Sequence, residues 1–240
     1  MSAANRYRVT LEYDQDAGCP CHEWDTLFQV VTGGNRRTHS LGRGRLSITA
    51  DEFDTYTREA AKDLNAGKPE RVIVLDVYEH SGIVFSLAGH GPADYGGWDT
   101  SRGGAVLIVK DQFREEFDGL SDEQRVELAE GFLSEFNNWA NGEVYGYAVE
   151  RLELCDHGEW HGVGGLDAFD GCYGFYGDPE ASGLLNNLAE VIPGEATAEQ
   201  LVITGAADYL LSAEQIIEER ARIEAAIKQR RKDAGRDDAK

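Results

Sequence analysis

Cysteine and histidine side chains gather in two short segments of the chain, and together they could hold a metal ion. Thiolate and imidazole are the ligands that Zn²⁺ favours, and four such ligands complete a tetrahedral site. A zinc ion shared between the two segments would hold distant parts of the chain together, which makes zinc the possible cofactor. The candidate ligands are three side chains from an N-terminal segment and three from a later one: Cys19, Cys21, His22, Cys155, His157 and His161.

The spacing of these side chains leaves an alternative open. Neither segment has the Cys-x₂-Cys spacing typical of zinc sites, and adjacent residues such as Cys21 and His22 rarely bind the same ion. In the alternative, Cys19 and Cys21 are exposed loop thiols, Cys155 and Cys172 are small buried side chains, and the histidines are solvated. This second interpretation predicts no cofactor. The spacing of the cysteines and histidines favours this second interpretation over a zinc site. A zinc-dependent enzyme or a zinc-stabilised interaction module is the alternative function.

No segment has the residue pattern of a nucleophilic or nucleotide-binding site. His80 and Ser81 are neighbours, but successive side chains in a strand point to opposite faces. The chain has no Gly-x-Ser-x-Gly turn, and its glycine-rich segments lack the phosphate-binding and dinucleotide-binding spacings. The sequence therefore favours a protein that is not an enzyme.

Charge is the strongest compositional feature of the chain. The 240 residues carry a formal net charge of -21, and residues 111–200 hold 21 acidic side chains against three basic ones. Such a surface repels the phosphates of nucleic acids and attracts basic proteins, so we expect no direct binding to nucleic acid. Either the carboxylates imitate a nucleic acid backbone and occupy the binding site of a partner, or they form a solvated surface that promotes solubility.

Two successive helices are expected between residues 110 and 140, and they would position the carboxylates for such mimicry. Ser121 and Gln124 have the spacing of a capping box, and the apolar residues that follow repeat with the period of a helix. Mimicry requires carboxylates spaced along an exposed ridge. The candidate partner-binding residues are Glu115, Glu116, Glu123, Glu127, Glu130 and Glu135.

The remaining periodic segments predict the fold class. Alternating or continuous apolar residues predict strands over residues 7–13, 26–32, 71–78, 83–88, 104–109 and 144–154. Further helices are expected over 49–65, 182–191, 198–211 and 212–234, and no element is assigned between 156 and 179. We therefore expect an α+β fold, with a mainly antiparallel sheet and helices packed on it. The predicted domains are an α+β domain over residues 1–180 and a helical C-terminal region over 181–240.

The last predicted helix has a narrow apolar seam among alternating charges. Ile216, Ile223 and Ile227 are spaced by seven and four residues, which suits packing on the rest of the protein or pairing with a second copy. A third interpretation is therefore an interaction module that self-associates through this C-terminal helix. No apolar run approaches the roughly 18 residues that cross a membrane, and the N-terminus does not have the pattern of a signal peptide, so we expect a cytoplasmic protein without membrane contact.

Three patches rich in glycine and aromatic residues, at 95–100, 139–147 and 171–178, could meet at a structural junction or a binding groove. The order of the short motifs His-Ser-Gly at 80–82, Trp-Asp-Thr at 98–100, Asn-Gly-Glu-Val-Tyr-Gly-Tyr at 141–147 and Cys-Tyr-Gly-Phe-Tyr-Gly at 172–177 resembles a family of uncharacterised proteins carried by tailed phages and mobile elements. The resemblance covers roughly residues 70–178. It implies a gene product that works in the cytoplasm of a host bacterium.

The charge distribution and this resemblance together predict a function. We expect a non-enzymatic protein that binds and modulates a host factor, and a counter-defence inhibitor that mimics nucleic acid is the specific form of that expectation. The partner would be a host protein, including one that itself binds nucleic acid.

Overall fold

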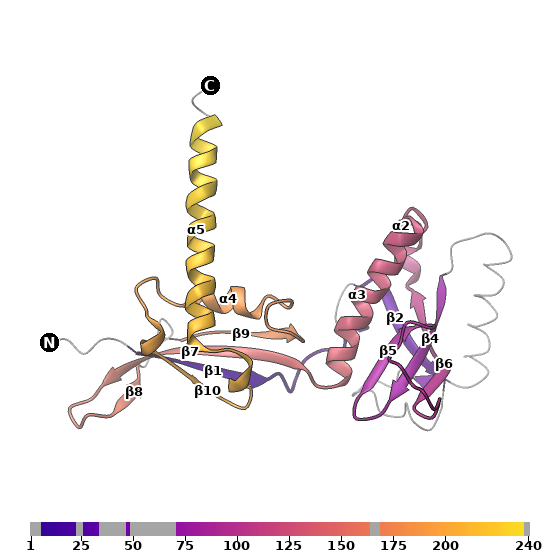
Figure 1. Cartoon of the computed structure of the whole chain (residues 1–240), viewed down its shortest axis with the longest axis horizontal. Coiled ribbons are helices and arrows are strands. Elements are labelled where there is room, and N and C mark those ends of the chain that lie inside the picture. The colour runs from indigo at the N-terminus through magenta and orange to yellow at the C-terminus, as the bar shows by residue number, and fades with distance from the viewer. Residues whose placement is uncertain (1–5, 23–25, 34–46, 49–70, 164–168, 238–240) are drawn as a thin grey trace. The chain divides into compact units, whose positions relative to one another are not determined.

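A computed structural model describes most of the chain and has an α+β fold (Figure 1). The described residues are 6–22, 26–33, 47–48, 71–163 and 169–237. Contacts divide the chain into two compact units. We call residues 1–17 together with 143–240 the terminal unit, and residues 18–142 the inserted unit.

This division differs from the predicted boundary near residue 180. The helical C-terminal region does not form a domain of its own, because its buried leucines and isoleucines belong to the same core as the first strand of the chain. The boundaries instead lie at Ala17–Gly18 and Gly142–Glu143, so the inserted unit interrupts the terminal unit.

The terminal unit is built on a mainly antiparallel sheet. Strand β7 (Val144–Leu154) pairs antiparallel with β1 (Arg6–Tyr13), β8 (Trp160–Gly162) and β9 (Phe169–Tyr176), while β10 (Leu201–Thr204) pairs parallel with β1. In β1, Tyr7, Val9 and Leu11 alternate with more exposed residues and are buried, as their spacing predicts. Helices α4 (Leu184–Val191) and α5 (Ala213–Asp237) pack against these buried side chains.

Strand β10 replaces the helix that was predicted over residues 198–211, and that prediction is wrong. Residues 201–204 pair with β1 in register, with Leu201 opposite Tyr7, between the short 3-10 helices η3 (Ala198–Gln200) and η4 (Asp208–Leu210). Gly205 ends the strand at φ +106°, and a Cβ atom there would lie 2.1 Å from the carbonyl oxygen of Leu11. Pairing with a strand nearly two hundred residues earlier therefore overrides the local helical pattern.

The inserted unit contains a second sheet, in the order β3-β2-β6-β4-β5. Its strands are β2 (Phe28–Gly33), β3 (Ser47–Ile48), β4 (Val72–Glu79), β5 (Ile83–Leu87) and β6 (Thr100–Val109). A 3-10 turn, η1 (Asp111–Phe113), leads into α2 (Arg114–Asp118) and then α3 (Asp122–Ala140). The helix predicted over 49–65 lies outside the described residues.

Helix α3 packs its apolar face on this sheet. The predicted capping box is confirmed: Ser121 accepts a hydrogen bond from the backbone of Gln124, whose side chain accepts one from the Ser121 N–H. Phe132 and Phe136 are buried and contact Phe28 and Phe85 of the sheet, with ring centroids 5.6 and 5.2 Å apart. This contact fixes which face of α3 points away from the core.

Asn137 of α3 and Asn141, the C-cap of that helix, bond to the edge strand β5. The side chain of Asn137 accepts a hydrogen bond from the N–H of Phe85 (2.8 Å) and donates one to its carbonyl (3.0 Å). Asn141 makes the same pair of bonds with Ile83, and Gly82 leaves room for it, because a Cβ there would lie 2.6 Å from the Asn141 side-chain oxygen. These amides satisfy backbone groups that an edge strand otherwise leaves open to another chain.

Candidate functional site

The six glutamates predicted to bind a partner all lie on two successive helices of the inserted unit, and all six are exposed. The predicted residues therefore belong to one unit, and their side chains are exposed to solvent. They are Glu115 and Glu116 on α2, and Glu123, Glu127, Glu130 and Glu135 on α3.

Three of these glutamates form a line on α3, which we call the acidic stripe: Glu123, Glu127 and Glu130. Spacings of four and three residues place them on one face of the helix, about 6 and 4.5 Å apart along its axis. Phe132 and Phe136, which are buried, lie on the opposite face. The acidic stripe is thus an exposed line of carboxylates on α3, away from these two buried rings.

The arginines closest in sequence to the acidic stripe are engaged elsewhere. Arg114 pairs with Asp111. Arg125 donates to Asp122 (2.8 Å), and its other guanidinium nitrogens donate to two backbone carbonyls at the end of α2 (3.0 and 2.9 Å). Neither arginine therefore pairs with the acidic stripe. Glu130 is bonded to His90, so Glu123 and Glu127 are the carboxylates of the stripe that these neighbours leave to a partner.

Local bonding and burial adjust the charge of two of the carboxylates in opposite directions. A hydrogen bond from its own backbone N–H at the start of α3, with a further one from Ser121, holds the pKa of Glu123 below its ordinary value. Partial burial raises the pKa of Glu135, which lies off the stripe. Glu123 is therefore charged over a wider range of pH than Glu135.

The acidic segment of the sequence, residues 111–200, is shared between the two units. Residues 111–142 of the inserted unit hold nine acidic and two basic side chains, and residues 143–200 of the terminal unit hold twelve and one. All six candidate glutamates fall in the first part. The partner-binding prediction accordingly concerns the inserted unit alone.

A second surface feature of the inserted unit is the loop between β5 and β6. The carboxylate of Asp94 accepts hydrogen bonds from the backbone N–H groups of Gly96 and Gly97 at one oxygen, and from those of Asp99 and Thr100 at the other, at 2.9 to 3.2 Å. Partial burial raises the pKa of Asp94, but the hydrogen bonds outweigh it, so the pKa lies below its ordinary value. One charged side chain therefore holds the loop in a defined shape.

This loop displays the two most exposed aromatic side chains among the described residues. Tyr95 is 102% exposed and Trp98 is 82% exposed. A Cβ atom at Gly96 would lie 2.3 Å from the indole of Trp98, so the ring rests against that glycine. We call residues 94–100 the aromatic loop. Large aromatic side chains exposed on a loop of defined shape are typical anchors of protein interfaces.

Two histidines form side-chain hydrogen bonds near the aromatic loop: one bonds to the loop itself, and the other lies in the segment before the loop and bonds to α3. His90 bonds to Glu130 of the acidic stripe at 3.0 Å, and His80 bonds to Asp99 at 3.1 Å. Both histidines are exposed. The connection through His90 makes the acidic stripe and the segment that enters the aromatic loop neighbours on one unit, which the sequence spacing did not indicate.

Part of the patch at 139–147 meets the patch at 171–178 in the terminal unit, while residues 139–142 belong to the inserted unit. Residues 144–147 of β7 pair with 172–176 of β9, and a Cβ atom at Gly146 would lie 2.1 Å from the ring of Tyr173. Glycine is needed there because an aromatic ring covers it. Residues 95–100 belong to the inserted unit, so only two of the three predicted patches meet within one unit.

The predicted zinc ligands are divided between the units. Cys19, Cys21 and His22 belong to the inserted unit, where both cysteines are buried in its core and His22 is exposed. The thiol of Cys21 accepts a hydrogen bond from the N–H of Val30 (3.3 Å), and contact with Cys19 together with burial raises its pKa, so it is protonated at neutral pH. The expectation that these two thiols are exposed is therefore wrong, because they pack in the core as small apolar side chains.

The later group of candidate ligands lies on the β7–β8 hairpin of the terminal unit. Cys155 begins its turn and is partly buried, while His157 and His161 are exposed, with His161 3.6 Å from Glu159. Across the described ranges, no three cysteine, histidine or acidic side chains lie close enough together to hold a metal ion. The zinc hypothesis gains no support from this arrangement and stays a prediction.

A search of protein-family models, curated proteins and solved structures finds no match to this chain. In the part of the chain that the structure describes, no helix is both long and apolar enough to cross a membrane.

Proposed function

We propose that this protein is a non-enzymatic binding protein whose inserted unit docks on the basic, nucleic-acid-binding surface of a host protein and modulates it. A single observation carries this proposal. The acidic stripe runs along the outward face of α3 while the arginines beside it in sequence are bonded to other groups. A row of carboxylates in this setting presents to a partner what a phosphate backbone presents.

The geometry of α3 supports this form of mimicry. Its carboxylates recur about every 4.5 to 6 Å along the helix axis, a spacing of the same order as the roughly 3.4 Å of duplex axis for each phosphate of one DNA strand. Charge of this kind accelerates encounter with a basic surface, and it weakens as salt is added. Tyr95 and Trp98 of the aromatic loop would then add apolar contacts with the partner. A sugar–phosphate backbone cannot make such contacts, and they slow dissociation of the complex.

The resemblance to proteins of tailed phages and mobile elements supports the biological setting of this proposal. A protein of that kind acts in the cytoplasm of the host bacterium, where host factors that bind nucleic acid include those that act against invading DNA. Counter-defence inhibition by occupying such a factor is the specific activity that we propose.

The experiment compares two variants of equal net charge. Tagged protein captures its partner from a bacterial lysate, and the dissociation constant is then measured with the purified partner. Changing the acidic stripe to lysine (E123K/E127K/E130K) should weaken binding at least about thirtyfold, because each close charge pair contributes about 1 kcal/mol or more. The control E180K/E195K/E199K changes three exposed carboxylates of the terminal unit and should weaken binding less than about threefold.

Competition identifies the surface of the partner. Duplex DNA added to the complex should displace the protein, and W98A should speed dissociation without changing the response to salt. Equal weakening by both triple variants would show that only net charge matters. Binding that duplex DNA leaves unchanged would rule out mimicry of nucleic acid.

A further inference from the structure

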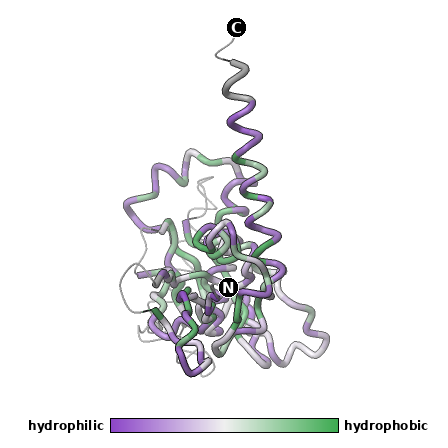
Figure 2. The backbone as a smooth tube through the Cα atoms, turned by 90° about the vertical axis from the view of Figure 1, so that its left-hand side faces the viewer, coloured by the Kyte–Doolittle hydropathy of each residue, from purple (hydrophilic) through white to green (hydrophobic). Residues whose placement is uncertain are grey.

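The C-terminal half of α5 leaves the core that holds its first half. Ile216 is fully buried and Ile223 packs at the margin of the same core. Arg220 donates to the carbonyls of Pro193 and Ala196, and from residue 224 to 232 every residue is exposed. Figure 1 shows this part of the helix projecting beyond α4, and Figure 2 shows its hydrophilic colouring.

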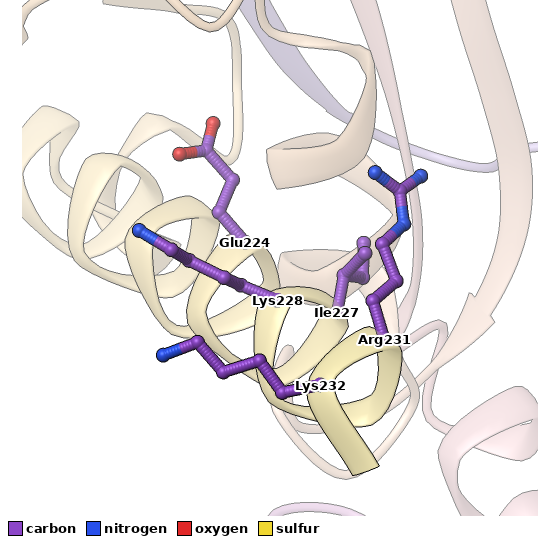
Figure 3. A pocket seen from close by; sticks show the side chains of 5 residues that line it. All are labelled: Glu224, Ile227, Lys228, Arg231 and Lys232. Atoms are coloured by element: carbon purple, nitrogen blue, oxygen red, sulfur yellow. The ribbon is translucent and has the colours of Figure 1, made fainter. Parts of the chain in front are cut away.

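This projecting segment is basic on a strongly acidic chain. Residues 225–232 contain four cationic side chains and no acidic one, and Ile227 among them is 45% exposed. An open groove of about 540 Å³ runs beside it, and most of the described residues that line it are charged (Figure 3). Its described lining residues are Glu224, Ile227, Lys228, Arg231 and Lys232. With three cations, one carboxylate and one apolar side chain, this lining suits a helix that carries carboxylates better than an apolar small molecule.

The outward face of α3 has the complementary composition. Val126 is 42% exposed and lies three residues after Glu123 and four before Glu130. It is therefore an apolar side chain with carboxylates of the acidic stripe on both sides. On α5, Ile227 has Arg230 and Arg231 three and four residues after it, and Glu224 three residues before it.

We propose that the basic segment 225–232 of one copy docks against the acidic stripe of a second copy. Ile227 packs on Val126, and Lys228 and Arg231 pair with carboxylates of the stripe at the normal 8–10 Å separation of packed helices. The two surfaces belong to different copies of one chain, so they are always present at equal concentration. This contact does not depend on the host partner, although the two would compete for the same stripe.

The structure disfavours the simpler pairing of two α5 helices. A coiled coil would use Ile216, Ile223 and Ile227 as its seam, but the first two already pack in the core of their own copy. Only Ile227 would remain, and the four cations of each segment would then face one another. The C-terminal helix is therefore better suited to an acidic surface than to itself.

Nucleic acid is the other class of anion that a basic helix could bind. The net charge of -21 opposes that encounter at long range, whereas the acidic stripe of a second copy brings its own carboxylates to the contact. We therefore commit to a second copy, and binding of nucleic acid becomes one outcome of the test.

The test is sedimentation equilibrium of the full chain, without any host protein. At about 50 mM salt the mass should rise with concentration above that of one chain, and at about 500 mM salt it should return to one chain. K228E/R231E/K232E and E123K/E127K/E130K should each weaken association at least about tenfold. The variant that combines both triples should restore association, because the charges are then exchanged between the two surfaces. I227D should also weaken it, and E180K/E195K/E199K should not.

Several results would overturn the proposal. One is a mass that stays at one chain at every concentration in low salt. Another is association that survives either triple change, or that the combined variant fails to restore, since both would place the contact elsewhere. Binding of a labelled DNA duplex that depends on Lys228, Arg231 and Lys232, without self-association, would assign the segment to nucleic acid. Loss of self-association would leave binding of the host partner to the stripe intact, so the two proposals fail separately.

Discussion

At the scale of single residues, Asp94 has the largest structural consequence in the candidate site. Its two carboxylate oxygens accept four backbone N–H groups, all of them within the loop that carries Tyr95 and Trp98. Aspartate is a common turn residue because it can bond to the N–H groups that follow it, and the sequence suggested no more than that. The number of N–H groups that bond to Asp94 depends on the backbone path of the whole loop, which the sequence does not show.

Replacing Asp94 by asparagine should loosen the aromatic loop. An amide has one accepting oxygen, so either Gly96 and Gly97 or Asp99 and Thr100 lose their acceptor. Amide hydrogen exchange at the affected pair, followed by NMR, should accelerate at least about tenfold. D178N is the matched control, since Asp178 accepts two backbone N–H groups in the terminal unit. It should leave exchange in residues 94–100 unchanged.

The same variant tests the pH dependence of the loop. The pKa of Asp94 is lowered below its ordinary value of 3.8 in the folded protein, so its stabilising effect is complete above that value and is lost as the pH falls through the lowered pKa. The amide proton shifts of residues 96–100 should follow this titration in the wild-type protein and should lose it in D94N. A wild-type midpoint above 3.8 would contradict the assignment.

At the scale of elements, α3 and its C-terminal cap have three roles. Phe132 and Phe136 build the core, the acidic stripe faces solvent, and Asn137 and Asn141 bond to the edge strand β5. The first two roles follow from helical periodicity and were predicted. The third was not, because an asparagine in a helix gives no sign of which backbone it will meet.

Asn137→Ala should destabilise the inserted unit by about 2 kcal/mol, because it removes two hydrogen bonds and leaves the N–H and carbonyl of Phe85 partly buried without them. Urea unfolding measures the change. Asn138→Ala is the matched control on the same helix and should stay within about 0.5 kcal/mol of the wild type. N137A should also aggregate more readily, because the edge of β5 becomes available to other chains. Equal effects of the two changes would contradict the role of Asn137.

At the scale of the whole molecule, the inserted unit enters and leaves the terminal unit through neighbouring strands. Tyr13 at the end of β1 pairs with Tyr145 near the start of β7, and the N–H of Asp14 donates to the carbonyl of Val144 (2.8 Å). The two connections therefore start side by side. A domain inserted in this way can be removed without separating the strands that flank it.

Replacing residues 18–142 by a turn of about three to five residues should therefore leave a folded terminal unit. The shortened chain keeps β1, β7 and the core formed with α4 and α5, so it should unfold cooperatively and keep dispersed amide signals. Circular dichroism and NMR measure both properties. A chain that remains unfolded would show that the terminal unit needs the inserted one.

Sequence alone determined the features that repeat within a short segment. Local periodicity and charge can be read from a short stretch of sequence. They predict the alternation of β1, the apolar β4, the capping box of α3, the α+β class and the exposure of the six glutamates. Only the tertiary structure decided what pairs across the chain. It placed residues 201–204 beside β1, put the two groups of zinc candidates in different units, and joined His90 to Glu130. Contacts of this kind depend on which surfaces fit together after distant segments meet, and local patterns do not encode that fit.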